Sequence, residues 1–560
     1  MCERELMDRP RGKNPHRSHV LAALIAFLIP IGVTSSVSAA TPLSGAVPTG
    51  HDPRGQRRDP ASHVRNKLEV ASDPSGPVSA TEPAQRLASS APPTATASPE
   101  APAVVGWGQN LSGQLGGGFF NNYVTWPVLG PAFTGVKGLT VGYHFSLALL
   151  EDGTVHGWGS NSFGQLGDGL RAESLTPMEV VGLTGVTAVA ASGMHTVALL
   201  GDGTVATWGA NIFGQLGNGT TGAGSEYLRY SSTVPVYLKS LSGVVAVAAG
   251  GANDAALLRD GTVMAWGENS AGQIGDGTTT EKDVPTKVHG LSNVKAIAIG
   301  GFASHGGHLL ALLNDGTVMA VGTNRSGQLG DGTTENRSVP VPVKGLSGVV
   351  AVSASQSHSM ALLSDGTIRA WGNNASGELG VGAGPEACST ALTRWACSRV
   401  PARVEALGNV TSVSAGWRFS LAVSAGRLFS WGSNEFGRLG NGTILSSSLP
   451  VAAGPSSVMS VAAGEEHSVA LLSRGAPAPE VEMSSGVGSL TISWRSSYLS
   501  EQWDLARRPV TDPRSKWCER VALPAATRSY TLSGLTSGQP YEVIVRNALF
   551  GYRIMIGTPG

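Results

Sequence analysis

The ten residues WGSNSFGQLG at positions 158–167 decide the fold, because the chain spells this stretch seven times with small changes. The copies recur at intervals of about 50 to 60 residues. Such a repeat is typical of a fold that uses one supersecondary unit many times. Six of the seven copies keep the leading tryptophan. The copies begin at Trp107, Trp158, Trp208, Trp266, Val321, Trp371 and Trp431.

A weaker phrase precedes each copy and predicts three short strands. It is clearest in GVTAVAASGMHTVALLGDGTVATWG at residues 185–209, where glycine-rich turns separate three apolar runs. The first run is rich in Ala and Gly, which suits the crowded axis of a closed ring. An Asp-Gly pair between the second and third runs predicts a tight hairpin turn. The Asp residues of these pairs are Asp152, Asp202, Asp260, Asp315 and Asp365.

A fourth run follows each glycine-rich copy and is marked by a proline. Proline has no N–H to donate to a strand ladder, so this run is predicted to be the exposed outer strand. Each repeat thus predicts four antiparallel strands, with small residues on the innermost strand and a proline on the outermost. This is the pattern of one blade of an all-β propeller. The prolines are Pro127, Pro177, Pro235, Pro285, Pro340, Pro401 and Pro450.

Residues 103–474 resemble the RCC1 repeat family through the seven WGxNxxGQLG copies and the HxxALxxDG phrases. The resemblance implies a seven-bladed β-propeller, in agreement with the count of copies. The repeat region starts on a third strand at Val104 and stops after a second strand at His467, which predicts that one blade is built from both ends. The departures are Val321 for Trp, Arg438 for Gln and the missing Asp before Gly426, and we expect each to weaken only its own blade.

The N-terminus predicts a secretory signal peptide over residues 1–39. The basic residues Arg9, Arg11, Lys13 and Arg17 precede an apolar run at 20–33, and small residues for cleavage follow at SSVSAA. The alternative is an uncleaved membrane anchor, but about 14 apolar residues are fewer than the roughly 20 that span a bilayer. Residues 40–102 are dominated by Pro, Ala, Ser and Thr, which predicts a disordered linker.

The charge balance argues against nucleic acid as a partner. The chain carries 39 basic and 39 acidic residues, and only 14% of its residues are charged. Removal of residues 1–39 leaves 34 basic and 36 acidic residues. A near-neutral product lacks the basic patch of a nucleic-acid binder. No second hydrophobic span is present, so we expect a secreted monomer that does not bind membranes after cleavage.

A different pattern begins after the repeats, at residues 477–560. The segments SLTISW from Ser489 and YTLSGLTSGQPYEVIVRNALFG from Tyr530 resemble a fibronectin type III module, a small β-sandwich. The resemblance implies that Tyr541 is the tyrosine-corner residue and that Trp494 is a core tryptophan. The middle of the segment, residues 498–526, departs from the pattern.

The four cysteines have different expected roles. Cys2 leaves with the signal peptide. Cys388 and Cys397 flank a short loop, so a disulfide is the simplest assignment in an oxidising compartment, with a metal-binding pair as the alternative. Cys518 is left over as an odd thiol, either buried or in an intermolecular bridge.

The sequence gives no catalytic or cofactor motif. Histidines recur at one position of the second strand, and we interpret them as structural side chains that bond neighbouring blades. The glycine-rich copies are not phosphate loops, because no GK[ST] follows them. We therefore expect no enzyme activity, no cofactor and no metal. The histidines are His195, His308, His358 and His467, replaced elsewhere by Phe145, Asn253 and Phe419.

The blades differ in one loop. The last Gly of each copy and the outer-strand Pro are 10 or 11 residues apart in five blades, but 18 residues apart at Gly217–Pro235 and 21 at Gly380–Pro401. Strand alternation places these insertions, at 218–234 and 382–400, on the same face as the turns between first and second strands. Tyr, Trp and Arg anchor protein interfaces, although ordinary exposed loops remain the alternative. The candidate partner-binding residues are Tyr143, His144, Met194, Glu226, Tyr227, Arg229, Tyr230, Asp254, Trp395, Trp417, Arg418, Glu465 and Glu466.

These patterns favour a secreted, non-enzymatic propeller that binds or inhibits another protein. The RCC1 resemblance implies an alternative, guanine-nucleotide exchange on a small GTPase, although a signal peptide would separate the chain from cytosolic GTPases. A polysaccharide-associated module is a second alternative, since fibronectin-like modules accompany secreted carbohydrate enzymes. Fold alone does not choose among them.

Overall fold

The computed structural model describes residues 102–222, 230–301, 306–382, 386–389, 394–473, 480–495, 503–509, 518–523, 529–547 and 551–559. The predicted signal peptide and all of the predicted linker except Pro102 lie outside these ranges. In the described ranges no helix is long and apolar enough to cross a membrane.

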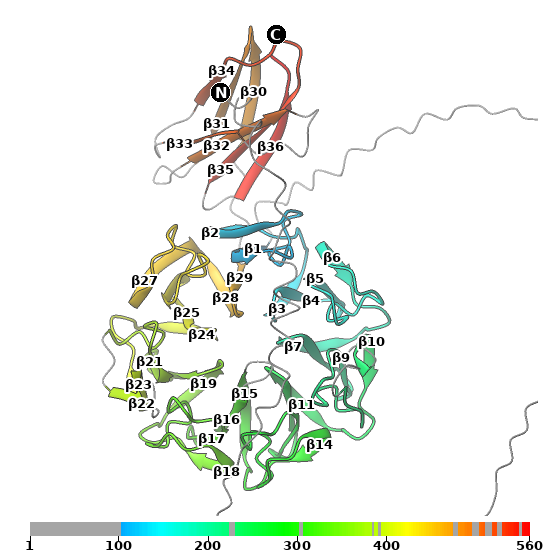
Figure 1. Cartoon of the computed structure of the whole chain (residues 1–560), viewed down its shortest axis with the longest axis vertical. Coiled ribbons are helices and arrows are strands. Elements are labelled where there is room, and N and C mark those ends of the chain that lie inside the picture. Colours follow the sequence, from blue (N-terminus) through cyan, green and yellow to red (C-terminus); the bar gives the residue numbers. More distant parts are fainter. Residues whose placement is uncertain are drawn as a thin grey trace, which may run out of the picture. The chain divides into compact units, whose positions relative to one another are not determined.

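Seven antiparallel sheets follow one another along the repeat region, as predicted, and each is a propeller blade (Figure 1). Blade 1 consists of β3(Val136–Val141), β4(Phe145–Leu150), β5(Val155–Gly159) and β6(Ser174–Glu179). Blade 2 consists of β7(Val186–Ser192), β8(His195–Leu200), β9(Val205–Gly209) and β10(Ser232–Tyr237), and blade 3 of β11(Val244–Gly250), β12(Asn253–Leu258), β13(Val263–Gly267) and β14(Lys282–Lys287). Blade 4 consists of β15(Val294–Gly301), β16(Gly307–Leu313), β17(Val318–Gly322) and β18(Arg337–Pro342).

Blades 5 and 6 continue the ring, and blade 7 closes it. Blade 5 has five strands, β19(Val349–Ala354), β20(His358–Leu363), β21(Ile368–Asn373), β23(Arg394–Arg403) and β22(Glu386–Ser389). Blade 6 consists of β24(Val410–Gly416), β25(Phe419–Ser424), β26(Arg427–Gly432) and β27(Ser447–Ser456). Blade 7 joins β28(Val458–Ala463) and β29(His467–Leu472) to β1(Ala103–Asn110) and β2(Asn121–Leu129).

Ring closure follows the prediction from the repeat boundaries. Strand β1 pairs antiparallel with β29, with Ala103 opposite Leu472 and Gly108 opposite His467. The first strand of each blade contacts the first strand of the next, from β3 through β7, β11, β15, β19, β24 and β28 back to β3. Small Ala, Gly and Ser side chains on these strands allow seven of them to meet at the axis.

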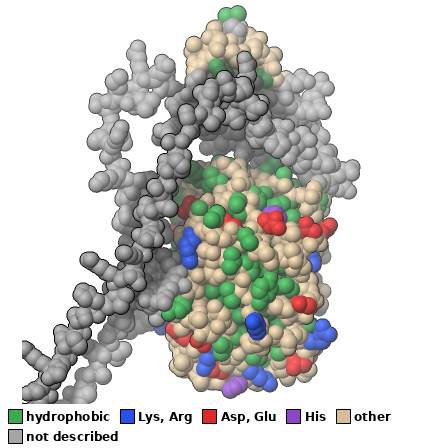
Figure 2. Space-filling view, turned by 90° about the vertical axis from the view of Figure 1, so that its right-hand side faces the viewer, with side chains coloured by type: hydrophobic (Ala, Val, Ile, Leu, Met, Phe, Trp, Pro, Cys, Tyr) green, Lys and Arg blue, Asp and Glu red, His purple; other side chains and the backbone are tan. Residues whose placement is uncertain are grey.

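The outer strands carry the prolines, as expected, with one difference. In blade 5 the hairpin strand β22 adds outside the first part of β23, at residues 394–397, so this part is not an edge. The residue before the proline is exposed and small in most blades, for example Val284 and Val339, but it is Trp126 in blade 7. Figure 2 shows hydrophobic side chains scattered over one side of the propeller among few charged ones.

The recurring Trp and final Gly of the repeat join neighbouring blades. We call this contact, an indole of one blade on the glycine and main-chain oxygen of the preceding blade, the lock. Each motif tryptophan is fully buried and donates its indole N–H to a main-chain oxygen of the preceding blade, at 2.7–2.9 Å. The indole lies against the last Gly of the preceding copy: a Cβ on Gly330 would lie 2.8 Å from Trp371 Nε1. This explains why W and the final G recur together. The pairs are Trp158 with Gln114, Trp208 with Gln165, Trp266 with Gln215, Trp371 with Gln328, Trp431 with Glu378 and Trp107 with Arg438.

Second-strand hydroxyls and histidines extend this lock. The hydroxyl of Ser359 donates to the Gln328 oxygen that also accepts the indole N–H, and it contacts His308 Nε2 at 2.7 Å. The same arrangement joins His358 to Ser420 and His467 to Ser146, each at 2.9 Å. The histidines therefore link neighbouring blades, which is the geometry that a structural role requires.

The junction between blades 3 and 4 is built differently. Val321 stands in the tryptophan position and Leu309 in the hydroxyl position. Both side chains are buried in one apolar cluster with Ile274 of blade 3. Apolar packing thus replaces the polar lock at this junction.

Residues 480–559 form two further antiparallel sheets in their described parts. One contains β30(Glu480–Gly486), β31(Ser489–Arg495) and β34(Ser529–Ser533), and the other β33(Cys518–Leu523), β32(Trp503–Pro509), β35(Tyr541–Asn547) and β36(Gly551–Gly557). Buried Leu490, Ile492 and Leu505 belong to a shared core. Tyr541 is buried, and its hydroxyl accepts the Thr536 N–H at 3.2 Å. The fibronectin assignment stays a prediction, and the side chains of Trp494 and Cys518 lie outside the described part.

A matched pair of glycines tests the lock. Gly330 and Gly345 both have a φ of +68°, but a Cβ on Gly345 would meet nothing within 4 Å. Gly345→Ala should cost about 1–2 kcal/mol of unfolding free energy from backbone strain alone. Gly330→Ala adds clashes with the Trp371 indole and with Val343, and should cost a further ~1–3 kcal/mol. Equal losses in urea unfolding would show that the indole contact does not stabilise the ring.

Histidine burial predicts a pH dependence. Burial lowers the pKa of His308 from its ordinary value of 6.5 to about 3, so the folded ring stays neutral where the unfolded chain becomes protonated. The unfolded state binds more protons between these values, and stability from this group is lost as the pH falls below 6.5. Asparagine, the residue used in blade 3, does not titrate, so His308→Asn removes this pH-dependent loss of stability. The decrease in unfolding free energy that His308→Asn causes at pH 7 should be about 2 kcal/mol smaller at pH 5. A decrease that is the same at both pH values would contradict the assignment.

Candidate functional site

Two sets of loops share one face of the propeller, which we call the loop face. After the third strand the chain donates a main-chain N–H to the turn between the first and second strands of the same blade. The bonds run from Ser160 to His144, from Ala210 to Met194 and from Ser433 to Arg418, at 2.8–2.9 Å. The Asp-Gly hairpin turns lie at the other end of the strands, as the sequence predicts.

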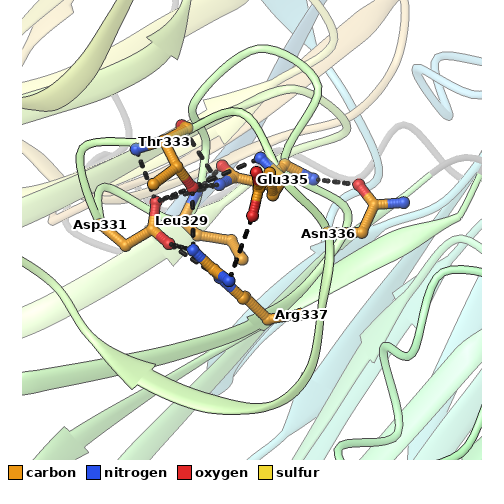
Figure 3. A network of polar contacts seen from close by, with 7 residues as sticks. Leu329, Asp331, Thr333, Glu335, Asn336 and Arg337 are labelled. Carbon is orange, nitrogen blue, oxygen red and sulfur yellow. Dashed lines mark hydrogen bonds and ion pairs between the residues drawn. The ribbon is translucent and has the colours of Figure 1, made fainter.

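The loops between third and fourth strands are stabilised internally. In blade 4 the side chain of Asn324 accepts the Leu329 N–H at 2.9 Å and donates to Asp331 at 3.1 Å. Asp331 also accepts from Thr333 and forms an ion pair with Arg337 at 2.9 Å (Figure 3). Burial acts to raise the pKa of Asp331, but these hydrogen bonds lower it overall. The loop therefore has a defined shape before any partner binds.

The second insertion is a hairpin held by a disulfide. Cys388 of β22 and Cys397 of β23 are bonded, as predicted, with a Cα–Cα distance of 5.7 Å. Trp395, opposite Cys388 in the hairpin, is half-buried. Of the candidate residues in the first insertion only Tyr230 is described, and it is also half-buried; Glu226, Tyr227 and Arg229 lie outside the described residues.

Six of the predicted residues come together on three consecutive blades, and we call them the three-blade rim. They lie on the turns between first and second strands of blades 6, 7 and 1. The rim consists of Trp417, Arg418, Glu465, Glu466, Tyr143 and His144.

Contacts across blades hold the rim residues in place. The Tyr143 ring stacks on His144 with centroids 4.0 Å apart, and His144 Nε2 lies 3.4 Å from the Glu466 carboxylate of blade 7. The Trp417 N–H donates to Gly464 of blade 7 at 3.1 Å. The Arg418 guanidinium lies 4.8 Å from the Trp417 ring centroid. Neighbouring blades thus share one polar and aromatic surface.

Arg438 supports the rim from below. Its side chain is fully buried, 5.5 Å from the Trp417 ring, and donates to the main-chain oxygens of Trp417 and Glu465 at 3.0 and 3.3 Å. It bridges blades 6 and 7, next to the junction that closes the ring. The Gln at this position elsewhere accepts a main-chain N–H two residues before it, as Gln328 does from Ser326, which an arginine cannot do.

The rim has an unusual electrostatic environment. Burial raises the pKa of Glu465 well above its ordinary value, and the charge of Glu466 adds to this, while Arg438 acts to lower it. Burial and the same two carboxylates raise the pKa of Tyr143. Burial lowers the pKa of Arg438. A cation bound beside Glu465 would lower this raised pKa.

Three of the predicted residues are buried: His144, which belongs to the rim, Met194 and Asp254. Asp254 was expected on the loop face, but its side chain is fully buried in β12 and pairs with His195 of blade 2 at 2.9 Å. It takes the place of the serine hydroxyl that other blades use in the lock, so Asp254 is inaccessible to a partner. Burial raises its pKa, although His195 opposes this.

A cavity of about 110 Å³ lies where the first strands of all seven blades end. Its lining residues are mostly glycine, alanine and serine, and the larger ones are Val141, Ile299, Gln356, Trp417 and Glu465. Sequence reasoning missed this axial cavity, because it arises from strand ends far apart in the chain. Among the described residues no group of three or more His, Cys, Asp or Glu is placed to hold a metal ion.

Sequence reasoning also underestimated the substitutions at the Gln position. The sequence predicts only that Arg438 weakens its own blade, yet its guanidinium donates to the main chain of two rim residues, Trp417 and Glu465. Glu378, at the same position in blade 5, is buried and accepts the Ser376 N–H, and burial raises its pKa to about 7. The feature of the sequence that could have identified both residues is an ionisable side chain at a position that is Gln in the other copies.

Comparison with known proteins places the fold in a family. A family model described as RCC1-like domain matches residues 94–397, and two RCC1 repeat models match residues 425–471 and 410–438. The Arabidopsis thaliana Ultraviolet-B receptor UVR8 is 30% identical over 174 residues. That stretch is 30% of this chain and only 38% of the receptor's length.

Solved structures agree on the fold. Yeast RCC1 (Prp20), in a complex with Kap60, has a TM-score of 0.58 and 24% identity and covers 66% of this chain and 88% of its own. Human WBSCR16 has a TM-score of 0.56 and 24% sequence identity, and the match covers 66% of this chain and 99% of the WBSCR16 chain. Because the RCC1-like domain model matches more than half of the residues, the chain belongs to the RCC1-like domain family.

Proposed function

We propose that this chain is a secreted, non-enzymatic propeller that binds another protein through its loop face, with the three-blade rim as the centre of the contact. The observation that carries the proposal is the set of contacts that fixes Tyr143, His144 and Glu466, and Trp417 with Arg418, across three blades. Such a protein would act as an interaction or inhibitor module and as a monomer.

The residue types suit a protein interface. Tyr, Trp and Arg contribute most of the binding energy in many interfaces. Side chains that are already ordered lose less entropy on binding, which costs roughly 0.5–1.5 kcal/mol for each mobile side chain. The ring stack, the His144–Glu466 contact and the arginine over Trp417 supply this order.

The relatives support a protein partner. Yeast Prp20 is described in a complex with Kap60, and Prp20p from Saccharomyces cerevisiae is described with binding properties to Gsp1p and histones. The likeness to both is 24% in sequence, so neither partner is transferred to this chain.

Secretion is supported by the N-terminal pattern of basic residues, a short apolar run and small residues at a cleavage position. The Cys388–Cys397 disulfide suits an oxidising compartment. We further propose that the C-terminal sheets form a fibronectin-like sandwich that serves as a spacer or second contact. The bond from the Thr536 N–H to the Tyr541 hydroxyl supports this comparison.

Guanine-nucleotide exchange on a small GTPase is the alternative that family membership favours. Such an activity would require a cytosolic location. Faster nucleotide release from a GTPase in the presence of the full chain, lost on rim substitution, would replace the binder proposal.

Substitution of the rim tests the proposal. A partner is first captured with the full chain from the organism's surroundings, and its affinity is then measured by calorimetry. Trp417→Ala and Tyr143→Ala should each weaken binding by about 2 kcal/mol or more, the scale of interface hot spots. Both should leave the melting temperature nearly unchanged, because neither side chain belongs to the fully buried core.

The matched control lies on the opposite face. Asp202 is exposed in a hairpin turn, where its carboxylate accepts the Thr204 N–H at 2.8 Å, and asparagine can do the same. Asp202→Asn should bind like the parent chain. Parent-like binding by the rim variants, with loss on changes to the hairpin face or C-terminal sheets, would refute the assignment.

A further inference from the structure

The axial cavity has one charged wall residue. Of the described residues that line it, Glu465 alone carries an ionisable side chain. The other wall residues are mostly glycine, alanine and serine from the inner ends of the first strands. At about 110 Å³ the cavity is far smaller than the roughly 300–1,000 Å³ of small-molecule sites, so it fits a group the size of one side chain.

Glycines shape this cavity. A Cβ on Gly416 would lie 2.8 Å from Gly464 O, and a Cβ on Gly300 would overlap Ser355 O. Only glycine lets these strand ends approach so closely. The wall consequently presents main-chain atoms with little side-chain cover, and main-chain carbonyl oxygens are acceptors for an N–H donor.

The Glu465 carboxyl has no direct cationic partner within the described part of the chain. The charge of Arg438 acts to lower the pKa of Glu465, but the Arg438 guanidinium donates to the main-chain oxygens of Trp417 and Glu465 and forms no ion pair with this carboxyl. Glu466, the neighbouring carboxylate, contacts His144. Since none of the described residues forms an ion pair with Glu465, a cation bound in the cavity would favour the charged form of this carboxyl.

We infer that the axial cavity receives one basic side chain, arginine or lysine, from the protein that the loop face binds. The cation pairs with Glu465, and its remaining N–H groups donate to oxygens of the cavity wall. This inference rests on the proposed function and adds to it the chemistry of the partner: a loop that presents a basic residue at its tip.

Model compounds test the cavity without a known partner. N-acetyl-arginine methylamide and N-acetyl-lysine methylamide are titrated into the full chain, with uncharged N-acetyl-norleucine methylamide as the control, and binding is followed by ligand-observed NMR. One or both basic amides should bind, and norleucine at least tenfold more weakly. Comparison of the two amides decides between arginine and lysine.

Two carboxylates on opposite faces provide the matched variants. Glu465→Gln should weaken binding of the basic amide at least tenfold, whereas Asp202→Asn, in an exposed hairpin turn on the other face, should change it less than twofold. Ala354→Leu fills the cavity without altering its charge and should also prevent binding. Equal binding to the parent and Glu465→Gln, or no binding of either basic amide, would overturn the inference.

The captured partner separates this inference from the proposed function. If Trp417→Ala weakens the partner and Glu465→Gln does not, the loop face binds protein but the cavity does not receive a basic side chain. If neither variant weakens the partner, the proposed function fails as well.

Discussion

The hydrogen bond from a buried indole to the main-chain oxygen of the preceding blade is the interaction on which the rest of the propeller depends. It occurs at six of the seven blade junctions, always with a glycine beneath the ring. One such bond contributes only about 1 kcal/mol net. The buried indole adds a larger hydrophobic contribution and fixes the distance between blades.

This lock explains how exposed turns can form a binding surface. The rim residues belong to short turns, yet each turn connects two strands whose positions the ring fixes. At the closing junction Arg438 replaces Gln and bonds to both turns from below, at Trp417 and Glu465. Arg438 therefore connects the turns of blades 6 and 7, beside the blade in which β1 and β29 close the ring.

The sequence predicted the features that follow from local pattern. The copies with Trp and Gly predicted the blades, prolines such as Pro285 marked the outer strands, and Val104 and His467 predicted closure through β1 and β29. The Cys388–Cys397 pair was predictable because both residues flank one short loop.

The remaining features depend on contacts between blades. Asp254 follows the turn and looked exposed, but its partner His195 comes from the preceding blade and holds it in the interior. The axial cavity is formed by strand ends from all seven blades, so no single stretch of sequence encodes it. Arg438 was expected only to weaken its blade, because its acceptors, Trp417 O and Glu465 O, lie 21 and 27 residues away in the sequence.

Hydrogen exchange of the chain alone and in complex with its captured partner tests the central claim most directly. Protection should appear in the turns at residues 142–144, 416–418 and 464–466. The hairpin turns at 152–153 and 202–203 should exchange as before. Protection confined to the hairpin face or to residues 480–559, with the three turns unchanged, would contradict the account.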